Sequence, residues 1–158
     1  YHDLPITPLY PFGHGLTYSE FRYKDLVQSV GEVDPGERID ISITVENIGG
    51  VASDEVVQLY VRDPVATIAR PTLELRGFTR VELGAGASKR VTFSLTPEQL
   101  AFWDPRGQWL IEAGRIDFWI GASSADLRAN GSFEITKTHP GSAPATALPT
   151  RVIVSGPD

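Results

Sequence analysis

The stretch Ile39-Asp40-Ile41-Ser42-Ile43-Thr44-Val45-Glu46 alternates strictly between aliphatic and polar side chains. Successive side chains of a β-strand point to opposite faces, so this stretch predicts a strand with one face in a core and the other toward water. Turn sequences flank it, Asp34-Pro35-Gly36 before and Asn47-Ile48-Gly49-Gly50 after. Proline presets φ and glycine accepts positive φ, so both segments favour tight turns that limit the strand to these residues.

The same period of two recurs along the chain in short runs separated by turn residues. Further strands are expected at about 55–62, 73–83, 90–95 and 128–135, with an alternation at Ile116, Phe118 and Ile120 and a hairpin over 103–112. Thr96 and Pro97 indicate one helical turn, as its N-cap and first helical residue. Seven or so short strands with regular turn signals are typical of an antiparallel sandwich. The predicted fold class is therefore all-β, an antiparallel two-sheet sandwich of the immunoglobulin or fibronectin III-like kind.

One core is expected to form from the inward faces of these strands. Its predicted members are Ile39, Ile41, Ile43, Val45, Val57, Leu59, Val61, Phe93, Trp109, Ile116, Phe118 and Ile120. Val56, Gln58 and Tyr60 lie on the opposite face of their strand, because they alternate with the inward residues. Gly77 interrupts the run 73–83 and indicates a β-bulge or a close contact with another part of the chain.

Composition divides the chain into three parts. Residues 1–22 are predicted to be an extended segment that arrives from a preceding domain, called here the leading segment, because its prolines exclude a helix. Residues 23–136 are predicted to form the sandwich, and residues 137–158 a tail rich in Pro, Ala and Thr. Within the tail, Arg151 to Ser155 could add an edge strand. The absence of methionine and the start at Tyr1 indicate a piece of a longer protein, for which a secreted or periplasmic location is consistent.

Charge and composition exclude several classes of function. The 158 residues contain no cysteine and carry a formal net charge of −6. The lack of cysteine excludes disulfides, thiolate metal sites and cysteine nucleophiles. An acidic chain without a basic cluster does not suit nucleic acid or an anionic membrane, and no stretch approaches the ~20 apolar residues of a membrane span. We therefore expect neither nucleic acid nor a membrane as a partner.

Residues 10–21, Tyr-Pro-Phe-Gly-His-Gly-Leu-Thr-Tyr-Ser-Glu-Phe, resemble the junction that leads into the C-terminal fibronectin type III-like domain of glycoside hydrolase family 3 enzymes. The resemblance continues in order through Val57–Val61, Asp63-Pro64, Arg70-Pro71, Glu74–Phe78, Leu95-Thr96-Pro97, the Trp109 hairpin and Gly121–Ser124, and departs at Leu73, where many relatives carry Lys or Arg. It covers most of residues 10–135. It implies a non-catalytic accessory domain of a retaining β-glycosidase, of the β-glucosidase or β-xylosidase type. The nucleophile and the acid/base of such an enzyme lie in upstream domains.

The residues of the chain agree with a non-catalytic reading. His2, His14 and His139 are far apart and lack the spacing of metal ligands, so no metal or cofactor is expected. A glycosidase pair needs two carboxyl groups about 5–10 Å apart across a sugar site. Carboxylates such as Glu55 and Asp104 lie on strand faces and in turns, with nothing to mark a pair. The chain by itself is therefore expected not to be an enzyme, and no catalytic residue is assigned.

Aromatic and basic residues outside the expected core are the candidates for an interface with the upstream catalytic domains. They are Tyr10, Phe12, His14, Tyr18 and Phe21 in the leading segment, Arg70 in the proline-bounded loop 63–72, and Trp119 on the outward face of its strand. By resemblance, the loop 63–72 could lean toward the active site of the parent enzyme and shape its entrance. For His14, between two glycines, a turn residue bonded to the backbone is the simpler alternative.

Two functional classes remain open from the sequence. The first is an accessory domain that packs on a β-glycosidase and stabilises it. The second is an independent carbohydrate-binding module, in which Trp103, Trp109 and Trp119 could supply sugar-stacking rings. The resemblance favours the first class because it supplies another domain for an outward tryptophan to contact.

Overall fold

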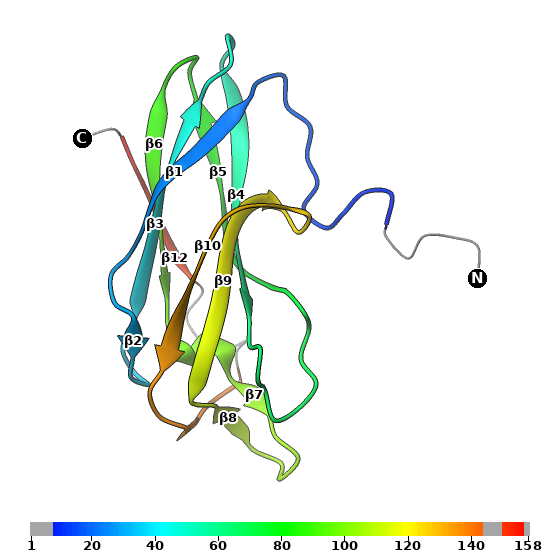
Figure 1. Cartoon of the computed structure of the whole chain (residues 1–158), viewed down its shortest axis with the longest axis vertical. Helices are drawn as coiled ribbons and strands as arrows, with labels where there is room; N and C mark the ends of the chain where they lie inside the picture. Colours follow the sequence, from blue (N-terminus) through cyan, green and yellow to red (C-terminus); the bar gives the residue numbers. More distant parts are fainter. Residues whose placement is uncertain (1–7, 144–149, 157–158) are drawn as a thin grey trace.

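Two β-sheets packed face to face make up the body of the molecule, as the computed structural model shows (Figure 1). The structure describes residues 8–143 and 150–156. The first sheet has the strand order β1-β3-β6-β12, and every neighbouring pair in it is antiparallel. Its strands are β1 (Phe21–Gln28), β3 (Ile39–Asn47), β6 (Ser88–Leu95) and β12 (Arg151–Ser155).

The second sheet has the strand order β2-β10-β9-β4-β5 and is antiparallel apart from the short parallel pair of β2 with β10. Its strands are β2 (Glu32–Val33), β4 (Ser53–Arg62), β5 (Glu74–Leu83), β9 (Gly114–Ser123) and β10 (Asp126–Ile135). The 3₁₀ turn η1 (Pro97–Leu100) links β6 to a small third sheet of β7 (Phe102–Trp103), β8 (Trp109–Ile111) and β11 (His139–Pro140). The predicted all-β sandwich is confirmed.

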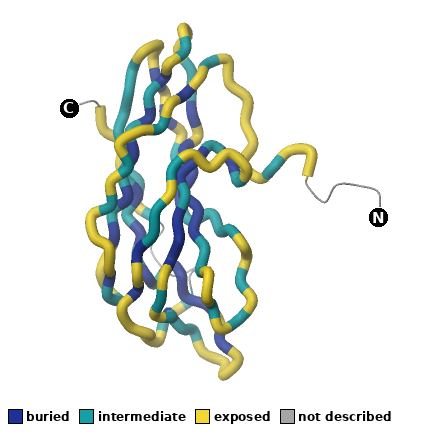
Figure 2. Tube along the Cα trace, viewed as in Figure 1, coloured by how far each residue is buried: buried dark blue, intermediate teal, exposed yellow. Residues whose placement is uncertain are grey.

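The core lies between the two large sheets, where Figure 2 shows buried segments on both layers. Eleven of the twelve predicted core residues are buried, and the twelfth, Trp109, is half-buried and packs against them. The strand β3 has the alternation that its sequence predicts, since its aliphatic residues are buried and the polar residues between them, Asp40 to Glu46, are partly exposed. Burying an aliphatic side chain contributes about 1.5–3 kcal/mol, so these faces supply most of the driving force for folding.

Two glycines that the sequence singles out, Gly36 and Gly77, occupy positions where a larger residue would be strained or would clash. Gly36 has a φ of +90° in a turn closed by Glu37 N, which donates to Asp34 O at 3.0 Å. Gly77 lies beside a register shift between β4 and β5, and a Cβ there would lie 2.9 Å from Cδ1 of the buried Phe93. Both the predicted bulge and the predicted close contact at Gly77 are therefore present.

Residues beyond 136 contribute to the sheets, so the sandwich extends past its predicted end. β11 pairs with β8, and β12 pairs with β6 along its whole length. The edge strand at Arg151–Ser155, left open by the sequence, is thus present, and Val152 packs against the core. Composition does not show this strand because it depends on the free edge of β6, a partner more than fifty residues earlier.

Candidate functional site

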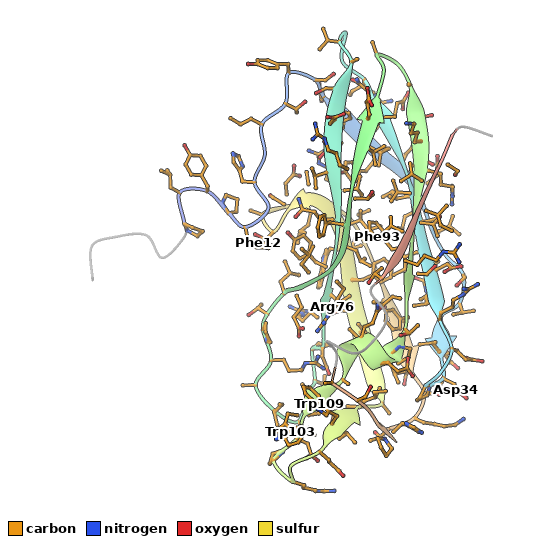
Figure 3. All side chains as sticks on the ribbon, turned by 180° about the vertical axis from the view of Figure 1, so that it is seen from behind. Phe12, Asp34, Arg76, Phe93, Trp103 and Trp109 are labelled. Atoms are coloured by element: carbon orange, nitrogen blue, oxygen red, sulfur yellow. The ribbon has the colours of Figure 1, made fainter. Side chains whose placement is uncertain are left out.

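Residues 12–20 of the leading segment pass along the outer face of the second sheet and are fastened to the sandwich through their backbone. Ser124 N donates to Phe12 O at 2.9 Å, and Gln58 Nε2 donates to Gly13 O at 3.1 Å. Nearer β1, Ile48 N donates to Glu20 O at 2.8 Å. Figures 1 and 3 show this segment running along the side of the sandwich. These bonds hold the chain path while leaving several side chains of the segment free to face outward.

Gln58 is the central anchor of this attachment. Its side chain lies on the outer face of β4 and is only 3% exposed, because the leading segment covers it. Its amide nitrogen also donates to Ala122 O, and its amide oxygen accepts from the Tyr60 hydroxyl at 2.6 Å. Every one of these partners is fixed by a strand or by the leading segment, so the amide orientation is determined.

Gly13 is the matching residue on the leading segment. It has a φ of +79° in a turn closed by His14 N, which donates to Pro11 O at 3.0 Å. A Cβ at this position would lie 2.1 Å from Gln58 Oε1. Glycine therefore satisfies two requirements here, a left-handed backbone conformation and close approach to the buried amide.

A groove of about 420 Å³ lies between the leading segment and the outer face of the sheet. Its walls are residues 12–17 on one side and the strands β4 and β5 on the other, with Val56, Leu75 and Phe78 as apolar lining. Four charged residues, Asp54, Glu55, Asp126 and Arg128, also contribute to its lining. The groove thus combines apolar and charged lining.

One of the charged residues is a buried carboxyl. Glu55 is 7% exposed, and burial raises the pKa of its carboxyl above the ordinary 4.5, although the Arg128 guanidinium opposes this in part. Arg128 lies over the Tyr23 ring at 4.8 Å, donates to Phe21 O at 2.9 Å and holds Asp126 through two bonds. Burial also raises the pKa of the Tyr23 hydroxyl. These groups link β1, β4 and β10, so their first role is to join the two sheets near one end.

The structure separates the predicted interface residues of the leading segment into two groups. Tyr10, Phe12 and His14 are exposed, with the Tyr10 and His14 rings 5.3 Å apart, and Tyr18 is 100% exposed. Phe21 is different, because it is buried in the core at the start of β1. Its assignment as an interface residue is therefore corrected to a core residue, since its position in the pleat directs the ring inward.

Arg70 also lies inside the domain rather than on its surface. Its side chain is only 9% exposed. The guanidinium donates to Leu100 O at 2.9 Å, pairs with Asp63 and Glu74, each at 3.5 Å, and lies 5.3 Å from the centre of the Phe102 ring. Arg70 therefore closes the loop 63–72 onto η1 and β7, and it does not present the predicted donor fork to a neighbouring domain.

Trp119 points away from the core, as its alternation with Phe118 and Ile120 predicts, and it is partly exposed. The Arg62 guanidinium lies 5.4 Å from the centre of its ring, and Arg62 also pairs with Asp117 at 3.2 Å. The ring is therefore part of a polar cluster on the outer face of β4 and β9.

Two residues important for this surface were missed by sequence reasoning, Gln58 and Asn47. The fully buried Asn47 donates to Leu83 O at 3.1 Å and Val51 O at 2.8 Å, accepts from Gly49 N at 3.0 Å, and also accepts from the Ser19 hydroxyl. A signal was available for Gln58, a single amide among Val56-Val57-Gln58-Leu59-Tyr60, because a buried polar side chain requires partners.

The described residues include no group of three His, Cys, Asp or Glu side chains that could hold a metal ion. His2 lies outside the described residues, while His14 and His139 are exposed in different parts of the chain. Among residues 8–143 and 150–156, no helix is long and apolar enough to cross a membrane.

Comparison with known proteins agrees with this architecture. Residues 55–124 match the family of fibronectin type III-like domains. The chain is 42% identical over 130 residues to a putative β-xylosidase of Formosa agariphila, a match that covers 82% of this chain. It is 39% identical over 140 residues to the thermostable β-glucosidase B of Acetivibrio thermocellus, a match that covers 87% of this chain.

A solved structure has the same fold. The β-glucosidase of Listeria innocua in complex with glucose matches 87% of the chain with a TM-score of 0.79 and 38% identity. The chain spans only 17%, 18% and 19% of the lengths of these three proteins, respectively. This chain is therefore a fibronectin type III-like domain, related to those of glycoside hydrolase family 3 β-glucosidases and β-xylosidases.

Proposed function

We propose that the chain is a non-catalytic accessory domain that packs against the catalytic domains of the same polypeptide and stabilises a β-glycoside hydrolase. The names of the relatives support the activity of the parent, since they are β-glucosidases and a putative β-xylosidase. The short share of each relative that this chain spans supports an accessory role, because most of each relative lies outside it. Carbohydrate would then be a partner of the parent enzyme through its catalytic domains.

The observation that carries the proposal is the contrast between the backbone and the side chains of the leading segment. Its backbone is fastened to the sheet at Phe12, Gly13 and Glu20, whereas Phe12 and Tyr18 expose their rings. Leu9, Tyr10 and Leu16 of the same segment are also exposed. Burying one such side chain contributes about 1.5–3 kcal/mol, so several of them on a segment with a fastened backbone favour a partner surface. The preceding part of the same polypeptide is the partner that this segment would reach first.

A second part of the proposal concerns the loop 63–72, which we place beside the entrance to the active site of the parent. The resemblance to family 3 enzymes motivates this position. The loop is stiff enough for such a role, because Arg70 holds its C-terminal end and Thr67 N donates to Glu112 Oε2 at 3.1 Å. A rigid loop at that position would alter substrate access without taking part in chemistry.

The experiment compares one double variant in two contexts. Phe12→Ser with Tyr18→Ser should lower the melting temperature of the full-length parent by several degrees, because two rings leave an interface. The same pair in the 158-residue chain should change stability by no more than about 0.5 kcal/mol, since both rings are exposed there. Ile153→Ser, which removes a partly exposed apolar side chain from β12 in the other sheet, is the matched control and should have little effect in either context. Equal, small effects of the double variant in both contexts would contradict docking.

A further inference from the structure

We infer that Trp103, at the end of the molecule formed by the β7–β8 hairpin, is a stacking site for a pyranose ring of a β-linked glycan. The class of ligand rests on the proposed function, which makes β-glycosides the substrates of the parent. Trp103 is 55% exposed, although tryptophan is usually well buried. Figure 3 shows Trp103 and Trp109 together at the lower end of the sandwich, away from Phe12 on the leading segment. A glycan at this end would therefore leave the proposed docking surface free.

The ring of Trp103 has a fixed support. Trp109 is its direct cross-strand partner, and the two ring centroids lie 5.5 Å apart in an edge-to-face arrangement at 74°. A Cβ at Gly107 would lie 3.9 Å from Trp103 Cζ2, so the ring extends along the turn toward this glycine. A ring supported by a neighbouring ring loses little conformational entropy when a ligand stacks on it.

The turn that carries the ring is itself rigid. Asp104 is buried, and its Oδ1 accepts from Arg106 N at 2.9 Å and Gln108 N at 3.1 Å. Asp104 N donates to Gln108 O at 2.9 Å, and Gly107 has the φ of +83° that closes the turn. The sequence Asp104-Pro105-Arg106-Gly107 thus presents Trp103 from a preformed hairpin.

The neighbours of Trp103 suit a sugar better than a protein surface. Within the hairpin 102–112, all of which the structure describes, Trp103 is the only large apolar side chain that is mostly exposed. An apolar protein interface requires a contiguous patch of several hundred Å². A pyranose instead offers one face of C–H groups for an aromatic ring and a rim of hydroxyl groups for polar side chains. Arg106 and Gln108 are exposed on the same turn. The Gln108 amide nitrogen donates to Asp104 Oδ2 at 3.3 Å, so the Arg106 guanidinium and the Gln108 amide oxygen are the groups able to supply that rim.

The test uses the 158-residue chain with soluble mixed-linkage β-glucan and with xylan, in affinity gel electrophoresis and titration calorimetry. At least one polysaccharide should retard the wild type. Trp103→Leu keeps an apolar side chain beside Trp109 but removes the flat ring, and should weaken binding about tenfold or more. Trp103→Phe should retain part of the affinity. Ile48→Ser, in the turn between β3 and β4 at the opposite end in Figure 1, should bind as the wild type does.

Each outcome of these binding measurements either supports or overturns the glycan site. No retardation of the wild type by either polysaccharide overturns the inference, as does unchanged affinity of a folded Trp103→Leu chain. An altered near-ultraviolet circular dichroism spectrum would show that Trp103→Leu disturbs the hairpin. In that case the Arg106→Ala variant is tested instead. Weaker glycan binding by this variant supports the site, and unchanged binding overturns it. Hydrogen exchange of the hairpin amides can also be compared between the ligand-free parent and this chain. Slower exchange in the parent would assign Trp103 to a protein contact instead. Failure of glycan binding leaves the docking proposal standing, because docking is measured by the stability of the parent.

Discussion

At the scale of single residues, one glutamine links the sheet to the segment that precedes it. Gln58 would be an unfavourable choice in an apolar strand if its amide lacked partners, since an unsatisfied buried polar group costs about 1–3 kcal/mol. Gly13, Ala122 and Tyr60 supply those partners. The path of the leading segment, and with it the direction of Phe12, therefore depends on a side chain forty-five residues later.

The buried Glu55 predicts a pH dependence of stability. Because burial places the pKa of its carboxyl above the ordinary 4.5 in the folded state, folding favours the protonated form. That stabilisation is complete below pH 4.5 and is lost as the pH rises through the folded pKa. Glu55→Gln imitates the protonated form at every pH. In urea unfolding between about pH 4 and pH 8, its stability relative to the wild type should increase with pH.

Asp126, also held by Arg128, provides a control of opposite sign. Hydrogen bonds from Arg128 lower the pKa of the Asp126 carboxyl below 3.8, so its stabilisation is present above that pH and is lost on acidification. Asp126→Asn should therefore be less stable than the wild type at neutral pH, with the difference closing toward acid. A Glu55→Gln chain whose advantage shrinks as the pH rises would contradict the assignment for Glu55.

At the scale of elements, β12 completes the first sheet at an edge that composition does not reveal. It pairs with β6 over five residues, and the Thr150 hydroxyl just before it donates to Arg76 O in the other sheet. Val152 faces the core, whereas Ile153 is partly exposed. The strand therefore both covers an edge and connects the two sheets.

Removal of residues 144–158 should lower the free energy of unfolding by about 1–3 kcal/mol, because Val152 leaves the core and β6 loses a partner. The uncovered edge of β6 should also increase association of the shortened chain, measurable by light scattering. Val152→Ser should reproduce part of the loss in stability, and Ile153→Ser should not. A shortened chain with an unchanged urea midpoint would show that β12 contributes nothing to the sandwich.

At the scale of the whole molecule, the sandwich presents distinct surfaces. The leading segment exposes aromatic rings along the side of the second sheet, and the β7–β8 hairpin exposes Trp103 at one end. The loop 63–72 is fixed to η1 and β7 by Arg70. Separate surfaces of this kind would allow an accessory domain to contact its own enzyme and a polymeric substrate at the same time.

The isolated chain should not hydrolyse aryl β-glucosides or aryl β-xylosides. Several of its carboxylates are engaged in structural pairs, such as Asp117 with Arg62 and Asp54 with Arg80, and the residues of the chain do not suggest a catalytic pair. The measurement is release of nitrophenol by purified chain over hours. Turnover that disappears when one of the carboxylates of this chain is substituted would contradict the expectation, whereas turnover that survives every such substitution would indicate contamination.

Local sequence patterns are sufficient to predict the fold class, the strands β3, β4, β5, β6 and β10, the turn at Gly36, the hairpin over 103–112 and the inward faces of the core. They do not predict β1 (Phe21–Gln28), which begins inside the predicted leading segment. The predicted features follow from local rules, because the alternation of side chains along a strand and the φ preferences of Pro and Gly act over a few residues. The family relationship was also recognisable, because its motifs occur in a specific order. The outward direction of Trp119 follows from the same alternation.

The arrangement of the outer surfaces depends on the folded sandwich. Phe21 enters the core rather than an interface, Arg70 is buried among partners that run from Asp63 to Phe102, and Gln58 is covered by the leading segment. Arg151–Ser155 becomes a strand because β6 offers a free edge. Each of these outcomes depends on contacts between residues far apart in the chain, whose formation requires the whole sandwich to close, and local periodicity carries no information about them.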